Sequence, residues 1–79
     1  MTRDELIAWA NEHGWKPDRH GHFQKVENGN GVQRHYRLKL SRIAARFETK
    51  TQYGWVRLRS GYYKNLNITA DGKLAGMTQ

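Results

Sequence analysis

The sequence predicts an α+β fold: one N-terminal helix packed on a curved antiparallel sheet of four to five strands, in two layers. Three observations carry this prediction. Apolar residues near the start recur at helical spacing, the pattern changes to strand-like alternation from about residue 22, and turn-forming residues separate the alternating runs. With 79 residues we expect a single domain over 1–79. A single helix covers one face of such a sheet, so the other face is expected to meet water.

The helix is predicted over about residues 3–13. Thr2, followed three residues later by Glu5, fits a capping box that satisfies two free backbone amides. Apolar and aromatic side chains then follow at helical spacing, at Leu6, Trp9, Ala10 and His13. Gly14 suits the position just after a helix end, and Pro17 prevents the helix from continuing.

The middle of the chain is predicted to form strands. Residues 22–26 form a short candidate strand, and the following Asn28-Gly29-Asn30-Gly31 is a turn, because Asn and Gly accept positive φ. Clear alternation begins at Val32, and its parity changes near Ser41-Arg42. Since neither Gly nor Pro occurs there, we expect a β-bulge or sharp bend within the strand rather than a loop.

Two further hairpins complete the predicted sheet. Gln52-Tyr53-Gly54 is a turn, residues 55–59 alternate again, and Asp71-Gly72 lies between the apolar residues of a last hairpin. We expect the core to draw on Leu6, Ile7, Ala10, Phe23, Val26, Tyr36, Leu38, Leu40, Ile43, Phe47, Val56, Leu58, Leu66 and Ile68.

Positive charge is concentrated in the middle of the chain. The whole sequence has a formal net charge of +7 from fourteen Lys/Arg and seven Asp/Glu. Residues 1–29 carry four cations and five acids, whereas residues 30–64 carry nine cations and one acid, Glu48, a net charge of +8. The predicted strands therefore supply the whole excess, which indicates an electrostatic binding surface.

The strand alternation predicts which residues lie on the open sheet face. If the apolar residues of each strand face the helix, the cations between them face outward, with an indole among them. The expected binding residues are His35, Arg37, Lys39, Arg42, Arg46, Lys50, Trp55, Arg57 and Arg59. Guanidinium groups match phosphates, and an exposed indole stacks on an unpaired base.

The predicted function is a small, non-enzymatic nucleic-acid-binding module that holds the phosphate backbone through this face. Engagement of about five phosphates would make log K fall against log salt with a slope of about −3.5 to −4.5. DNA and RNA are not distinguished, because neither a recognition helix nor a ribonucleoprotein motif is present. One alternative is a protein-interaction module, an adaptor or inhibitor of the kind encoded by phages and mobile elements, that binds an acidic partner. Another is a basic face that only keeps the sheet soluble and protects its edges.

Composition limits the other function classes. The absence of cysteine excludes disulfides and Cys-based metal sites. His20 and His22 alternate, but no carboxylate or third histidine stands at a defined spacing, so we expect neither a metal nor another cofactor. No apolar run approaches the ~18 residues of a membrane span, and no signal peptide is evident, so a cytoplasmic location without membrane contact is expected.

A further alternative is a small ribonuclease in which His22 works with Lys25 as an acid–base pair. Helix-end residues His13-Gly14-Trp15-Lys16, followed by Arg19-His20-Gly21-His22-Phe23-Gln24-Lys25, resemble the opening of the HicA-type toxins. The resemblance implies an mRNA interferase of double-stranded-RNA-binding-like fold with His22 as the catalytic histidine. It covers only residues 2–26, and residues 60–79 indicate strand and turn where that family has its second helix.

Overall fold

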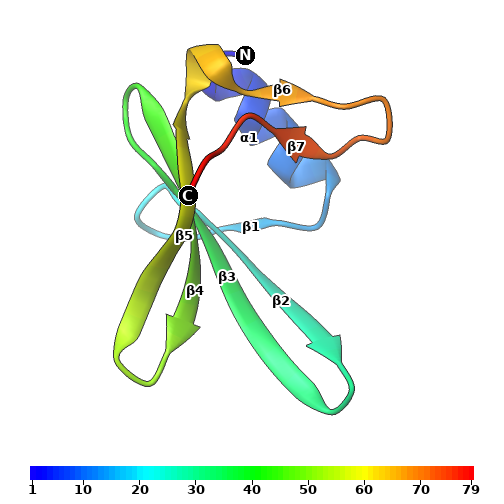
Figure 1. The fold of residues 1–79 in the computed structure, drawn as a ribbon, viewed down its shortest axis with the longest axis vertical. Coiled ribbons are helices and arrows are strands. Elements are labelled where there is room, and N and C mark those ends of the chain that lie inside the picture. Colours follow the sequence, from blue (N-terminus) through cyan, green and yellow to red (C-terminus); the bar gives the residue numbers. More distant parts are fainter.

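A computed structural model describes residues 1–79, which form one helix packed on a five-stranded antiparallel sheet, with a small second sheet beside it (Figure 1). Helix α1 spans Arg3–Glu12 and begins with the predicted capping box: the amide of Glu5 donates to Thr2 Oγ1, and the amide of Thr2 donates to Glu5 Oε1. Gly14 follows the helix with φ +83°, in the left-handed region that favours glycine. The α+β fold with its N-terminal helix is thus confirmed.

The main sheet has its strands in chain order, β1-β2-β3-β4-β5, and every neighbouring pair is antiparallel. The strands are β1 Lys16–Pro17, β2 Phe23–Gly29, β3 Val32–Leu40, β4 Ala44–Thr51 and β5 Gly54–Tyr62. After β5 the chain forms a short 3-10 helix, η1 Tyr63–Asn65, and then a two-stranded sheet of β6 Asn67–Ile68 and β7 Leu74–Ala75. The predicted last hairpin is therefore present, but it forms a sheet of its own.

The connection between β3 and β4 differs from the prediction of a bulged strand. Ser41 closes a tight turn: its amide donates to the Ala44 carbonyl at 2.9 Å, and its hydroxyl accepts from the Ala44 amide at 3.1 Å. The serine side chain stabilises the reversal, so the turn needs neither Gly nor Pro. The parity change near Ser41-Arg42 thus marks the reversal between two strands.

A β-bulge occurs instead in β5. Phe47 lies opposite Arg59 and Glu48 opposite Arg57, so Leu58 is an extra residue without a partner in β4. The bulge shifts the alternation of the strand by one residue. Trp55 and Arg57 consequently lie on one face of the sheet, and Arg59 lies on the other.

The two long hairpins separate toward their tips (Figure 1). Strands β3 and β4 pair only from Tyr36↔Thr49 to Leu40↔Ala45, so their other halves belong to the β2–β3 and β4–β5 hairpins alone. The β2–β3 turn has positive φ at both Asn30 and Gly31, which suits a tight hairpin. At the other tip Tyr53 is 89% exposed.

The core lies where the sheet meets α1 and the chain after β5. Its buried residues are Leu6, Ala10, Trp15, Phe23, Leu38, Leu40, Ala45, Tyr63 and Leu66. Some expected core residues are instead exposed: Val26, Ile43, Val56, Leu58 and Ile68. Four of them lie on the separated hairpins, on the outer side of the sheet, in the β3–β4 turn or in the bulge, and Ile68 lies in the small sheet, in β6.

Candidate nucleic-acid interface

The face of the main sheet opposite α1, hereafter the outer face, gathers most of the predicted binding residues. The register places Lys39 opposite Arg46, Arg37 opposite Glu48, and Glu48 opposite Arg57, while Lys50 lies opposite Trp55. Paired residues of neighbouring strands share a face. Seven of the nine predicted residues thus belong to the outer face: His35, Arg37, Lys39, Arg46, Lys50, Trp55 and Arg57.

Glu48 lies at the centre of the outer face and is only 3% exposed. Its Oε1 accepts a hydrogen bond from Arg37 Nε at 2.7 Å, and its Oε2 lies 3.8 Å from Arg46 Nη2. Arg57, on the adjacent strand β5, lies directly opposite Glu48. This carboxylate holds together strands whose cations would otherwise repel one another, because a buried acid needs charged partners.

One face of the Trp55 indole, the side chain expected to stack on a base, is covered by Arg37. The Arg37 guanidinium carbon lies 4.5 Å from the centre of the indole ring, and Trp55 is half-buried. A guanidinium over an indole is a favourable cation–π arrangement. Together with Glu48 it fixes Arg37 in one orientation, so Arg37 and Trp55 form a rigid centre beneath the freer cations.

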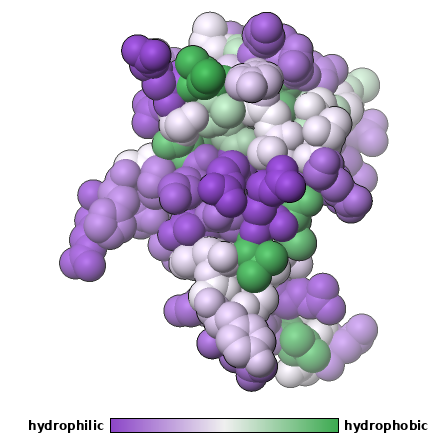
Figure 2. All heavy atoms as spheres, turned by 60° about the vertical axis from the view of Figure 1, so that its left-hand side comes forward, coloured by the Kyte–Doolittle hydropathy of each residue, from purple (hydrophilic) through white to green (hydrophobic).

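The freer cations of the outer face are Lys39, Arg46, Lys50 and Arg57, all of them exposed. Arg57 Nη1 donates to Ser60 Oγ at 3.0 Å, so this guanidinium extends along β5. From Lys50 to Ala44 the strand rises about 3.3 Å per residue, which gives the surface a length of about 20 Å. Figure 2 shows hydrophilic side chains gathered in a belt across the molecule, above its forked lower end.

Two predicted residues lie elsewhere. Arg59 faces the helix side of the sheet, because the bulge at Leu58 reverses its direction relative to Arg57. Arg42 lies in the β3–β4 turn rather than on a strand, where it lines a shallow hollow with Ile43, Tyr62 and Lys64. The expected placement of Arg59 is thus wrong, and Arg42 extends the basic surface only at its end.

His22 is held by its surroundings rather than paired with Lys25. Its Nδ1 accepts a hydrogen bond from the amide of Leu40 at 3.0 Å. Burial lowers the pKa of His22, and the charges of Arg37 and Lys39 lower it further, against the opposing effect of Asp18. Lys25 points to the other side of β2, where its ammonium lies 5.8 Å from the Trp15 ring centre. The predicted acid–base pair is therefore not formed.

Asp18 organises the loop before β2. Its carboxylate accepts hydrogen bonds from the amides of His20 and His22 at 2.8 and 3.0 Å and from Gln24 Nε2 at 3.0 Å. These hydrogen bonds lower the pKa of Asp18, although its burial acts in the opposite direction and is the largest single influence. The structure contains no group of three or more His, Asp or Glu side chains arranged to hold a metal ion.

Glu48 is the member of the outer face that the sequence prediction omitted, although a signal for it was present. It is two residues from Arg46 and two from Lys50, so alternation alone places it among the cations of the same face.

No helix of the structure has the length and apolar character needed to cross a membrane. Comparison of the chain with protein-family models, with curated proteins and with solved structures finds no match.

Proposed function

We propose that the protein is a small, non-enzymatic module that binds the phosphate backbone of nucleic acid through its outer face. The observation that supports this most directly is the charge arrangement around Glu48. Its carboxylate is already engaged by Arg37 and Arg46, while Lys39, Lys50 and Arg57 have no ion-pair partner. A surface of about 20 Å with this excess of charge attracts a polyanion.

The geometry favours backbone contact over base stacking. Arg37 covers one face of the Trp55 indole, so the strongest stacking group of this surface is already partly occupied. Lysine and arginine side chains bind phosphates without reading the base sequence. We therefore expect binding that depends strongly on salt and weakly on base composition.

The first test is fluorescence anisotropy with labelled double- and single-stranded oligonucleotides of mixed and homopolymeric sequence. We expect log K to fall against log salt with a slope of about −3.5 to −4.5, because each displaced counterion contributes about −0.9 for duplex DNA. Lys50→Gln and Arg57→Gln should each weaken binding and each reduce the steepness of the slope by about 1.

Arg34→Gln is the matched control for these variants. It removes the same charge, but Arg34 of β3 lies opposite Glu27 of β2 and faces the helix side of the sheet. Equal weakening by all three variants would show that net charge alone matters and would overturn the outer face as the binding surface. Absence of binding at low salt, combined with capture of an acidic protein that survives nuclease treatment, would favour the protein-interaction alternative.

Glu48→Gln separates a binding surface from a merely structural ion pair. Loss of the carboxylate leaves Arg37 without its charged partner, so we expect the free energy of unfolding to fall by about 1–3 kcal/mol. The same change frees positive charge, so binding should tighten and the salt slope should steepen by about 1. Lower stability together with unchanged or weaker binding would contradict the proposed role of this surface.

A further inference from the structure

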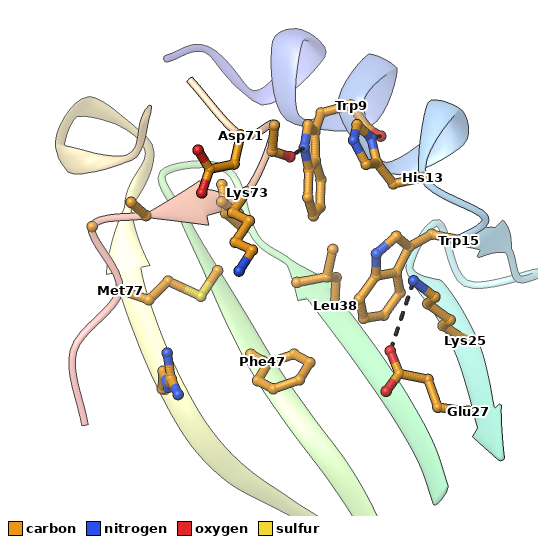
Figure 3. A pocket seen from close by; sticks show the side chains of 15 residues that line it. Trp9, His13, Trp15, Lys25, Glu27, Leu38, Phe47, Asp71, Lys73 and Met77 are labelled. Carbon is orange, nitrogen blue, oxygen red and sulfur yellow. Dashed lines mark hydrogen bonds and ion pairs between the residues drawn. The ribbon is translucent and has the colours of Figure 1, made fainter. Parts of the chain in front are cut away.

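A cavity of about 600 Å³ lies on the helix side of the sheet, away from the outer face. Its walls come from the end of α1, from β2–β5 and from the β6–β7 hairpin with the residues after it (Figure 3). A cavity of this size falls in the range of small-molecule sites, about 300–1,000 Å³. The proposed nucleic-acid interface does not use any of its lining residues.

Aromatic and apolar side chains form much of the cavity wall. Trp9 and Trp15 project toward Leu38 from the helix side, and Phe47 and Met77 lie below (Figure 3). Two contacts fix Trp9. One face of its ring stacks on His13 with centroids 4.7 Å apart, and its Nε1 donates a hydrogen bond to the Gly72 carbonyl at 2.8 Å. Flat, rigid walls of this kind suit a planar aromatic ligand.

The charged groups around the cavity leave positive charge unpaired. Lys25 has a partner, because its Nζ lies 3.8 Å from Glu27 Oε1. Neither Arg59 nor Lys73 forms an ion pair. The Lys73 ammonium points into the cavity, while the Asp71 carboxylate is directed away from it (Figure 3). An anionic group entering beside Lys73 and Arg59 would therefore find two free cations.

We propose that this cavity binds a small planar aromatic molecule that carries a phosphate or carboxylate group. The aromatic ring lies against Trp9 and against the Trp15–Phe47 pair, whose rings pack edge to face 6.1 Å apart, so that apolar surface is removed from water. The anion lies toward Lys73 and Arg59, where charge-assisted hydrogen bonds are available. A nucleoside monophosphate and an aromatic carboxylate share this chemistry, and the experiment below distinguishes them.

The three indole N–H groups make the test direct. In ¹H–¹⁵N NMR spectra Trp9 and Trp15 report on the cavity, while Trp55 reports on the outer face. We expect titration with adenosine 5′-monophosphate or with indole-3-acetate to shift the Trp9 and Trp15 signals with saturation and to leave Trp55 unchanged. Saturation by only one of the two compounds identifies which anion the cavity accepts.

Lys73→Gln tests the charged half of the site and Lys64→Gln serves as its control, because Lys64 lies outside the cavity. A lost charge-assisted hydrogen bond should weaken binding by about tenfold in Lys73→Gln, with no change in the control. Adenosine, which lacks the phosphate, should bind the native protein as weakly as adenosine 5′-monophosphate binds the Lys73→Gln variant. The proposal is overturned if neither compound shifts the cavity indoles, if Trp55 shifts in their place, or if both lysine variants weaken binding equally.

Discussion

His22 links the loop before β2 to the end of β3 through a hydrogen bond that only its neutral form accepts in this way. Protonation of Nδ1 would replace an acceptor by a donor facing the Leu40 amide. The depressed pKa of His22, caused first by burial and then by Arg37 and Lys39, agrees with this arrangement. His22 therefore has a structural role, because it connects the loop before β2 to Leu40 at the end of β3.

This arrangement predicts a pH dependence of stability. Because the pKa of His22 is lowered in the folded state, the unfolded chain takes up the proton first as the pH falls below about 6.5. The contribution of His22 to stability is thus fully present above that pH and is lost as the pH falls through the folded pKa. Urea unfolding at pH 7.5 and pH 5 should show a smaller loss on acidification in His22→Asn than in the native protein.

His35→Asn is the control for this experiment, because the His35 imidazole forms a hydrogen bond only with the Gln33 side chain, at 3.4 Å, and accepts none from a backbone amide. It should keep the native pH dependence. An identical loss of stability on acidification in the native protein and in His22→Asn would show that other groups cause the effect.

Among the elements, the segment after β7 is held against η1 by an unusually close backbone approach. A Cβ on Gly76 would lie 2.1 Å from the Asn65 carbonyl oxygen, and the φ of Gly76 is +101°. Glycine is therefore required here for two reasons, its conformation and the missing side chain. The same segment reaches β5, where Ser60 and Thr78 exchange backbone hydrogen bonds.

We expect Gly76→Ala to release this segment and to destabilise the whole fold. Gly21→Ala is its matched control, because Gly21 has φ +80° but open space around it. The control should cost only the left-handed backbone strain, about 1–2 kcal/mol. Chemical unfolding should show a clearly larger loss for Gly76→Ala, and hydrogen exchange at the Ser60 and Thr78 amides should accelerate. Equal losses in both variants would mean that the close approach is not limiting.

At the scale of the whole molecule, the separated hairpins leave a small core. Only ten of the 79 residues are buried, and one of them is Glu48. A domain with so little buried apolar surface should have an unfolding free energy near the lower end of the usual range of about 5–15 kcal/mol. Truncation of one large core side chain should therefore remove a large part of the free energy of unfolding.

Leu38→Ala tests this. Leu38 is 1% exposed near the end of β3, and truncation of such a side chain costs about 2–5 kcal/mol. We expect the free energy of unfolding of the variant to fall to about 0–3 kcal/mol, measured by urea denaturation followed by circular dichroism at 25 °C. Val32→Ala in the same strand, where the side chain is 53% exposed, should keep the native unfolding midpoint. A Leu38→Ala protein whose free energy of unfolding stays close to the native value would show that the hairpins contribute more stability than their exposure indicates.

Local chemistry made several parts of this fold predictable from the sequence. The capping box at Thr2 and Glu5, the glycine after α1 and the Asn30-Gly31 turn each depend on neighbouring residues, so the sequence alone determines them. Alternation within β4 likewise determines that Arg46 and Lys50 share a face with Glu48. These features supply the α+β class and most of the basic surface.

Only the tertiary structure decided the rest, because it depends on contacts between distant segments. The β5 bulge at Leu58 appears only when β5 pairs with β4, and it moves Arg59 from the outer face to the cavity. Arg37 covers Trp55 because two strands bring them together from 18 positions apart. The pattern of residues along one strand predicts only which side chains of that strand share a face. Register, bulges and the convergence of Trp9, Phe47 and Lys73 around one cavity follow from how the strands and the helix pack.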